Sequence, residues 1–273
     1  MSYLHCKWAI LIVSLAFANP YSLFAQTQNN LTEEQMRNFL LHANVIGSKQ
    51  SGKGRTSPFR LTLKSGDMVH DGSFQSIDQI RTSVQLSNGR VEANFRDSYK
   101  YNIAAFELAK MLGLGDMMPV TVERKWGGKI GALSWWLPVK MDEEQRLNKH
   151  IEPPDPEAWN RQMYKMRVFA QLVYDTDRNL GNVLISEDWH LWMIDFSRAF
   201  RLYTTLENPK NLEKCDRLLL QRLRQLDAAE LERKTKNYLN EMEVKGVMAR
   251  RDKIVALFES LIAKKGEKEV LYD

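Results

Sequence analysis

The feature that most constrains the fold is a polar loop at residues 177–182, because the segments on its two sides have different hydrophobic periods. Before the loop, residues 157–175 place apolar side chains on one helical face, at Trp159, Met163, Met166, Phe169 and Val173. After it, two short apolar runs between residues 183 and 194 flank a polar turn, which is typical of a β-hairpin. A helix, a loop and a hairpin in this order bring Asn182 and Asp195, at the two ends of the hairpin, side by side.

The residue types in this segment indicate a chemistry. Aspartate and asparagine oxygens suit a hard cation, and phosphoryl transfer requires such a cation together with a carboxylate that orients the attacking oxygen. His190 is the one residue between 177 and 195 that is a histidine or a cysteine, which argues against zinc. We therefore expect Asp177 to be the catalytic carboxylate, and Asn182 and Asp195 to bind Mg²⁺ or Mn²⁺.

The spacing and the local sequence resemble a known superfamily. Asp177, followed after five residues by Asn182 and after thirteen more by Asp195, has the spacing of the protein-kinase catalytic loop and metal-binding aspartate. The segments TDRNLGNVLI and MIDFSRAF resemble the catalytic segments of type II phosphatidylinositol 4-kinases, HipA-type kinases and the secretory-pathway casein kinase family. SYKYNIAAFELAKMLGL followed by MMPVTVER is similar to the N-lobe helix and the next strand of the secretory family.

The resemblance covers residues 47–200 and implies a bacterial, exported member of this atypical kinase-like superfamily. It implies an α+β, two-lobed protein-kinase-like fold, with a small, mainly β N-lobe that contains one helix and a mainly helical C-lobe. It also implies Asp177 and Arg178 as catalytic residues, and ATP or another nucleotide as a cofactor beside the metal.

The N-lobe departs from the family pattern. Kinases pair a strand lysine with a helix glutamate so that the lysine holds the nucleotide phosphates. Here Gln75 stands at the lysine position and Asn102 at the glutamate position. Glu107 follows one turn later, and we expect it to assist the metal or a lysine in the nucleotide site. Lys64, or Lys53 in the glycine-rich loop, could supply the missing charge, and a surface-exposed lysine is the alternative for both. Without a lysine at the phosphates, activity would be slow or diverted.

Periodicity and turn residues divide the chain into the same two lobes. The N-lobe, residues 27–138, contains a capping box and a series of short elements: a helix at 32–41, a glycine-rich loop at 47–54, strands at 59–63 and 68–75, a helix from Ser98 to about Leu112, and strands at 120–123 and 130–137. The C-lobe, residues 139–273, contains a proline cluster at 151–156, the long helix, the hairpin and further helices after about Asn211.

The glycine-rich loop also matches G-x-x-x-x-G-K at residues 47–53, the pattern of a phosphate-binding loop that opens a helix. The match fails at the next positions, where Gly54 replaces the required hydroxyl residue and Pro58 leads into a predicted strand. We interpret the glycines as a lid over phosphates or as a turn.

Residues 1–25 have the pattern of a signal peptide. Lys7 is their one charged residue, residues 8–18 are nearly all apolar, and Ala16-Phe17-Ala18 provides a small-x-small end. The run is shorter than a membrane span, so we expect no membrane span after signal removal and a periplasmic or secreted protein. Cys6 would leave with the signal, so Cys215 would be the remaining cysteine and no internal disulfide could form.

Charge excludes one class of partner and leaves the acceptor open. The net charge of +5 is spread along 273 residues, and no nucleic-acid surface is expected. The predicted function is a metal-dependent transfer of phosphate from a nucleotide to a protein, lipid or small molecule. The alternatives are a pseudokinase that binds nucleotide or acts as a scaffold, and a nucleotidyl transferase. Arg198 and Arg201 could bind an anionic group of the substrate or form structural ion pairs.

Overall fold

The computed structural model describes residues 31–51, 58–85, 89 and 91–273. The predicted signal peptide at 1–25, and Lys53 with the glycines that flank it, lie outside the described residues. The signal peptide and the role of Lys53 therefore stay predictions.

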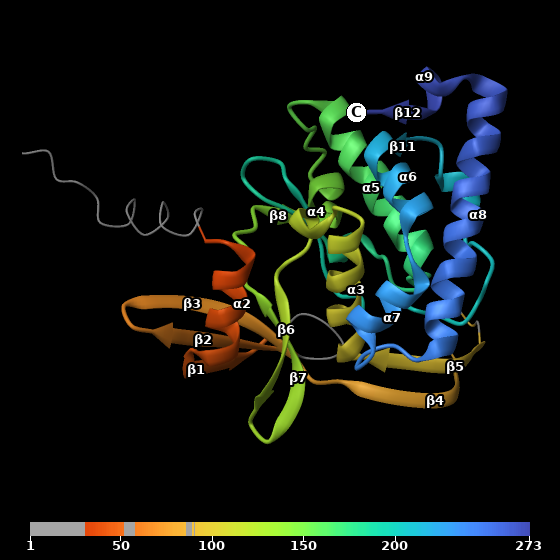
Figure 1. Ribbon diagram of the computed structural model, residues 1–273. Helices are drawn as coiled ribbons and strands as arrows, with labels where there is room; N and C mark the ends of the chain where they lie inside the picture. Colours follow the sequence, from red (N-terminus) through yellow and green to blue (C-terminus); the bar gives the residue numbers. More distant parts are fainter. Residues whose placement is uncertain (1–30, 52–57, 86–88, 90) are drawn as a thin grey trace, which may run out of the picture.

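An antiparallel five-stranded sheet forms the N-terminal region, in the order β1-β2-β3-β7-β6 (Figure 1). Its strands are β1 Asn44–Gln50, β2 Phe59–Ser65, β3 Met68–Gln75, β6 Thr121–Trp126 and β7 Lys129–Trp135. Helix α2, Glu33–His42, begins at the predicted capping box, in which Thr32 and Gln35 each bond the other's backbone N–H. Helix α3, Tyr99–Met111, ends before Gly113 as predicted, and both helices pack on β6 and β7.

One predicted boundary in this region is wrong. Residues 47–50, expected as the start of the glycine-rich loop, belong to strand β1 and pair with residues 59–62 of β2. The phosphate-binding-loop alternative is excluded with it, because such a loop must run into a helix, and Phe59 instead begins a strand.

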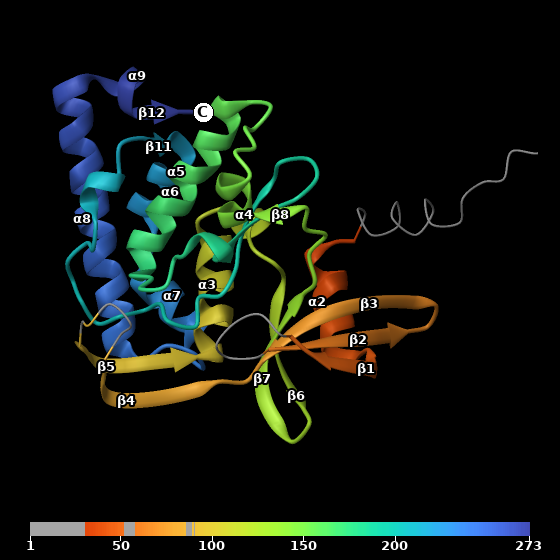
Figure 2. The same cartoon turned by 180° about the vertical axis from the view of Figure 1, so that it is seen from behind.

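A second hairpin was not expected from the sequence. Strands β4, Asp78–Gln85, and β5, Val91–Ser98, form a separate two-stranded sheet that leads directly into α3. Figure 2 shows this hairpin running from the five-stranded sheet to the far edge of the helical region. Near its base, where β5 leads into α3, an ion pair joins Arg96 to Glu243, which lies in α8 (Glu241–Lys265) and has a buried side chain. The chain reaches α3, and with it the candidate site, through this hairpin.

The C-terminal region is mainly helical. A small antiparallel sheet, in the order β10-β9-β8, contains the predicted catalytic hairpin and lies between α5 and the N-terminal region. The elements are β8 Met141–Asp142, α4 Glu143–Asn148, α5 Pro156–Val173, η2 Leu180–Asn182, β9 Val183–Ile185, β10 Leu191–Met193, β11 Cys215–Asp216, α6 Arg217–Gln225, α7 Ala228–Thr235, α8 Glu241–Lys265, α9 Glu267–Val270 and β12 Leu271–Tyr272. The predicted fold class is thereby confirmed.

A single hydrophobic cluster joins the two regions. It contains Leu61 of β2, Phe106 of α3, Phe169 of α5 and Phe258 of α8, each at most 1% exposed. Because the core is continuous, burial does not mark a cut between lobes, and the boundary at 138/139 stays a prediction. Among the described residues, no helix is long and apolar enough to cross a membrane.

Candidate functional site

The centre of the site is the guanidinium group of Arg178. Its Nε donates to the carboxylate of Asp175 at 2.8 Å, and the Asp175 side chain is fully buried. Its Nη1 donates to the backbone carbonyls of Asn182 at 2.9 Å and Ile194 at 2.8 Å, and Nη2 donates to that of Asp195 at 3.4 Å. The planar fork of an arginine can join separate strand ends in this way. Arg178 therefore holds the backbone of Asn182 and Asp195 side by side.

Asp177 is placed by the backbone of the same loop. Its N–H donates to Asp175 Oδ1 at 3.0 Å, and its carbonyl accepts from Asn182 Nδ2 at 3.0 Å. This second bond uses the amide nitrogen of Asn182, which leaves the amide oxygen on the opposite side as the potential cation ligand. The Asp177 side chain is 40% exposed, so a substrate can reach its carboxylate.

Asp195 combines backbone strain with a buried charge. It has a left-handed φ of +54°, which costs about 1–2 kcal/mol for a non-glycine residue. Burial raises the pKa of its carboxyl group, against the opposing influence of hydrogen bonds from Ser197 and Gln75 and of the positive charge of Arg178. Its Oδ1 is buried and has no hydrogen-bond partner among the described residues. An orphaned carboxylate oxygen in a strained position is a strong indication of a ligand-binding role.

The two departures from the kinase pattern meet in space. Asn102 Nδ2 donates to Gln75 Oε1, so β3 and α3 are joined by two side-chain amides at the positions predicted for the lysine and the glutamate. Asn102 Oδ1 accepts from the backbone N–H of Phe196 at 2.7 Å. The strand, the helix and the residue after Asp195 are therefore connected through one asparagine side chain.

Asp97, at the end of β5, belongs to the site and was missed by the sequence analysis. The backbone N–H of Ser98 donates to the carbonyl of Ser197 at 2.8 Å, which places β5 beside the segment after Asp195. Burial raises the pKa of Asp97, Ser197 and Arg198 act to lower it, and the charges of Asp195 and Asp177 raise it further. No motif marks Asp97 in the sequence. The one available signal was its position, because it is an acidic residue directly before Ser98, where helix α3 was predicted to begin.

The two arginines after Asp195 have different roles. Arg198 Nη1 lies 3.5 Å from Asp177 Oδ2. Arg201 is 5% exposed, and its Nη1 donates to the carbonyl of Arg96 at 2.7 Å. Both arginines therefore make contacts within the protein. The contact of Arg201 connects β5 to the segment after Asp195.

Other predicted nucleotide-binding residues lie away from this group. Glu107 pairs with Arg37 and Lys110, next to α2, because five residues of helix rotate its side chain about 140° from Asn102. Lys64 is exposed at the far end of β2, roughly 17 Å along the strand from Phe59, the partner of Phe74. The structure brings together Gln75, Asp177, Arg178, Asn182 and Asp195, but neither of these two residues.

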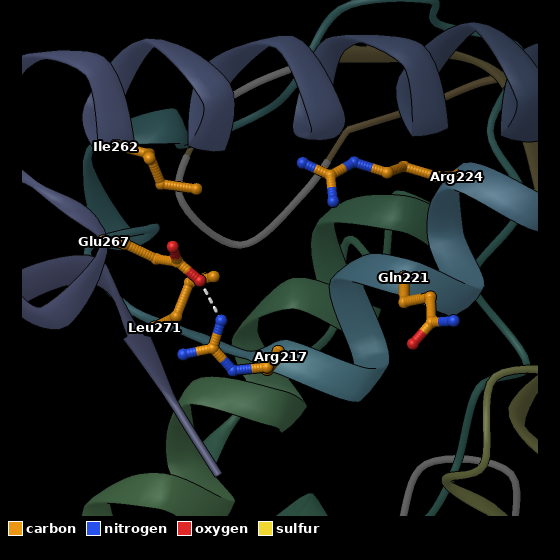
Figure 3. A pocket seen from close by; sticks show the side chains of 6 residues that line it. All are labelled: Arg217, Gln221, Arg224, Ile262, Glu267 and Leu271. Atoms are coloured by element: carbon orange, nitrogen blue, oxygen red, sulfur yellow. Dashed lines mark hydrogen bonds and ion pairs between the residues drawn. The ribbon is translucent and has the colours of Figure 1, made fainter.

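Two hollows in the surface lie outside the site. One, of about 310 Å³, is lined by Arg217, Gln221, Arg224, Ile262, Glu267 and Leu271 at the C-terminal end of the helical region (Figure 3). Figure 3 shows that Arg217 points to Glu267, so its charge is already paired. The other, of about 230 Å³, lies between α2, α3 and β10 and is mostly apolar. Neither is lined by a residue of the candidate site.

The sequence and structure comparisons give different results. No protein-family model and no curated protein matches the sequence. Solved structures do match: hydra Fam20 with sugar has a TM-score of 0.66 at 14% identity, covering 88% of this chain and 91% of that one. The Golgi casein kinase with Mn/ADP bound has a TM-score of 0.62 at 12% identity, covering 88% and 78%. The Helicobacter pylori proinflammatory kinase CtkA has a TM-score of 0.56 at 12% identity, covering 83% and 98%.

The fold is therefore similar to that of these kinase-like structures, as the sequence resemblance predicted. The similarity to Fam20 and the Golgi casein kinase extends over most of this chain, while identities of 12–14% limit the conclusion to the fold.

Proposed function

We propose that this protein is a metal-dependent phosphotransferase of the kinase-like superfamily, which transfers phosphate from ATP or another nucleotide to an acceptor. The observation that carries the proposal is the Arg178 fork, because it joins the backbone of Asn182 to that of Asp195, whose carboxylate has a buried oxygen without a partner among the described residues. Asn182 in turn bonds the carbonyl of Asp177. The kinase-like neighbours support the same reading at the level of the fold.

The residues present fit a hard divalent cation. Magnesium binds through one or two carboxylates, waters and substrate phosphates rather than through a full protein cage. Consistent with this, the described part of the chain has no group of three or more His, Cys, Asp or Glu side chains that could hold a metal ion by themselves. Asp195 and the amide oxygen of Asn182 would hold Mg²⁺ or Mn²⁺, and the cation would neutralise charge on the nucleotide phosphates. A Golgi casein kinase has been solved with Mn and ADP bound.

Asp177 would orient the acceptor hydroxyl and accept its proton. Its carboxylate is exposed enough for substrate access, while its backbone is fixed by Asp175 and Asn182. Arg198, 3.5 Å from the Asp177 carboxylate, would receive an anionic group of the acceptor.

The test is a phosphate-transfer assay on the chain without residues 1–25, with ATP and Mn²⁺. Asp177→Ala and Asp195→Ala should each abolish release or transfer of phosphate. Asp188→Ala is the matched control, because Asp188 lies in the β9–β10 turn and bonds Ser186. Activity that survives both site substitutions would reject the assignment.

A pseudokinase is the second candidate, favoured by the Gln75–Asn102 pair. A nucleotide that binds only the native state raises the melting temperature by mass action, even without turnover. A shift with ATP and Mn²⁺ in the absence of transfer supports a nucleotide-binding module, and mass spectrometry of the products identifies a nucleotidyl transferase. Export to the periplasm or the medium is also part of the proposal, supported by the signal-peptide pattern, and the acceptor would be a protein, lipid or small molecule met there.

A further inference from the structure

Two carboxylates of the site each have a buried, unsatisfied oxygen. Oδ1 of Asp97 and Oδ1 of Asp195 are both inaccessible to solvent and have no hydrogen-bond partner among the described residues. Asp97 as a whole is 9% exposed. A buried polar atom without a partner costs about 1–3 kcal/mol, and more when it is charged. Two such atoms in one site require an explanation.

The two carboxylates belong to one group. The negative charge of Asp195 acts on the Asp97 carboxylate. Two hydrogen bonds fix the end of β5 beside the segment after Asp195: the backbone N–H of Ser98 donates to the carbonyl of Ser197 at 2.8 Å, and Arg201 Nη1 donates to the carbonyl of Arg96 at 2.7 Å.

The arginines nearby are not the missing partners of the two orphaned oxygens. Arg178 is committed to Asp175 and to three backbone carbonyls, and Arg198 to Asp177. A pair of buried like charges is stabilised either by a shared proton or by a bound cation.

We propose that Asp97 is a metal ligand, which holds a divalent cation together with Asp195. This assignment rests on the proposed function and deepens it. It gives the site a second carboxylate on the α3 side, where Asn102 supplies only a neutral amide. Asn182, Asp195 and Asp97 then surround the cation from the loop, the hairpin and the β5 end, with the remaining positions open to water and phosphate oxygens.

The test measures Mn²⁺ binding and does not depend on turnover. Free Mn²⁺ is followed by electron paramagnetic resonance during titration of the chain without residues 1–25, and unfolding is followed by circular dichroism with and without Mn²⁺. Asp97→Asn should weaken Mn²⁺ binding about tenfold or more. It should also raise the melting temperature of the metal-free protein, because it removes one of two repelling charges, and reduce the shift that Mn²⁺ produces.

Asp78→Asn is the matched control. Asp78 lies opposite Ser98 on the same hairpin, but its carboxylate is exposed and paired with Lys100. It should bind Mn²⁺ like the parent chain. If Asp97→Asn does not fold, two experiments replace it. The first repeats the titration with Asp97→Ser. The second cleaves the unchanged chain oxidatively with Fe²⁺, peroxide and ascorbate, and cuts near both residues 97 and 195 support the proposal.

The outcomes separate the two proposals. If Asp195→Asn loses Mn²⁺ while Asp97→Asn keeps the parent affinity, Asp97 is not a ligand and the proposed function stands. If the parent chain binds no Mn²⁺ with or without ATP, the metal site itself is refuted. If Asp97→Asn stabilises the metal-free protein but leaves the Mn²⁺ shift unchanged, the two carboxylates share a proton and the proposal is overturned.

Discussion

The buried ion pair between Asp175 and Arg178 should dominate the stability of the catalytic loop. The side chains are 0% and 10% exposed, so water screens neither charge well. Removing one partner of such a pair costs about 3–5 kcal/mol, because the other charge stays buried without compensation. A whole domain is stable by about 5–15 kcal/mol, so either single change should be severe.

A double-mutant cycle tests this reasoning. Asp175→Asn and Arg178→Met should each lower the free energy of unfolding by about 3–5 kcal/mol, as measured by urea titration with circular dichroism. The double variant should lose about 2–3 kcal/mol less than the sum of the two, because it contains no uncompensated charge. Arg178→Met should also abolish phosphate transfer, since the loop backbone loses the donor that joins its two ends.

Arg217→Met provides the control for the cycle. Arg217 also pairs with two acids, Glu267 and Asp273, but its side chain is 46% exposed. Exposed pairs contribute about 0–1 kcal/mol, so this variant should unfold almost like the parent. If Arg178→Met costs no more than Arg217→Met, or if the two buried changes are additive, the loop does not depend on this pair.

Two further predictions concern the N-terminal sheet. Gly131→Ala should lower the free energy of unfolding by about 1–3 kcal/mol, as measured by urea titration. The new Cβ would overlap the Gln75 carbonyl and lie 2.8 Å from the Phe74 ring. Gly47→Ala is the control and should have little effect, because the nearest atom to its Cβ would be 3.5 Å away. Burial lowers the pKa of His70 below its usual 6.5, and the neutral ring donates a hydrogen bond to the Trp136 carbonyl. The stability that His70 contributes is therefore complete above pH 6.5 and is lost as the pH falls below that value. Urea midpoints at pH 7.5 and 5.5 should differ less in His70→Phe than in the parent, and an equal difference would contradict this assignment.

The parts of the fold that the sequence predicted have strong periodic signals. Helix α5 and the β9–β10 hairpin differ clearly in hydrophobic period, and their order alone placed Asn182 next to Asp195. The capping box at Thr32 was readable because its bonds are local. Gln75 and Asn102 were located by resemblance, and the structure joins them.

The parts that were missed lack such signals. Strand β4 is exposed along nearly its whole length, so no alternation of apolar residues marks it, and the chain between 78 and 98 offered no pattern. Asp97 lies one residue before the end of the partner strand β5 and was missed with it. Glu107 was chosen for its charge, although a helix turns it toward Arg37 and away from Asn102. The glycines at 47 and 52 suggested a loop, but residues 47–50 belong to strand β1. The local sequence does not show this, because the strand forms by pairing with residues 59–62, which lie further along the chain.

The Gln75–Asn102 contact has a consequence for control of the protein. A lysine–glutamate bridge weakens with salt and opens when the acid is protonated, so helix position in such a lobe can be toggled by charge. Two amides neither ionise nor respond to ionic strength, and here the same asparagine also anchors the backbone after Asp195. The contact that joins the sheet, helix α3 and the backbone after Asp195 therefore does not depend on the ionisation of either side chain, and a change of pH or salt should leave it in place.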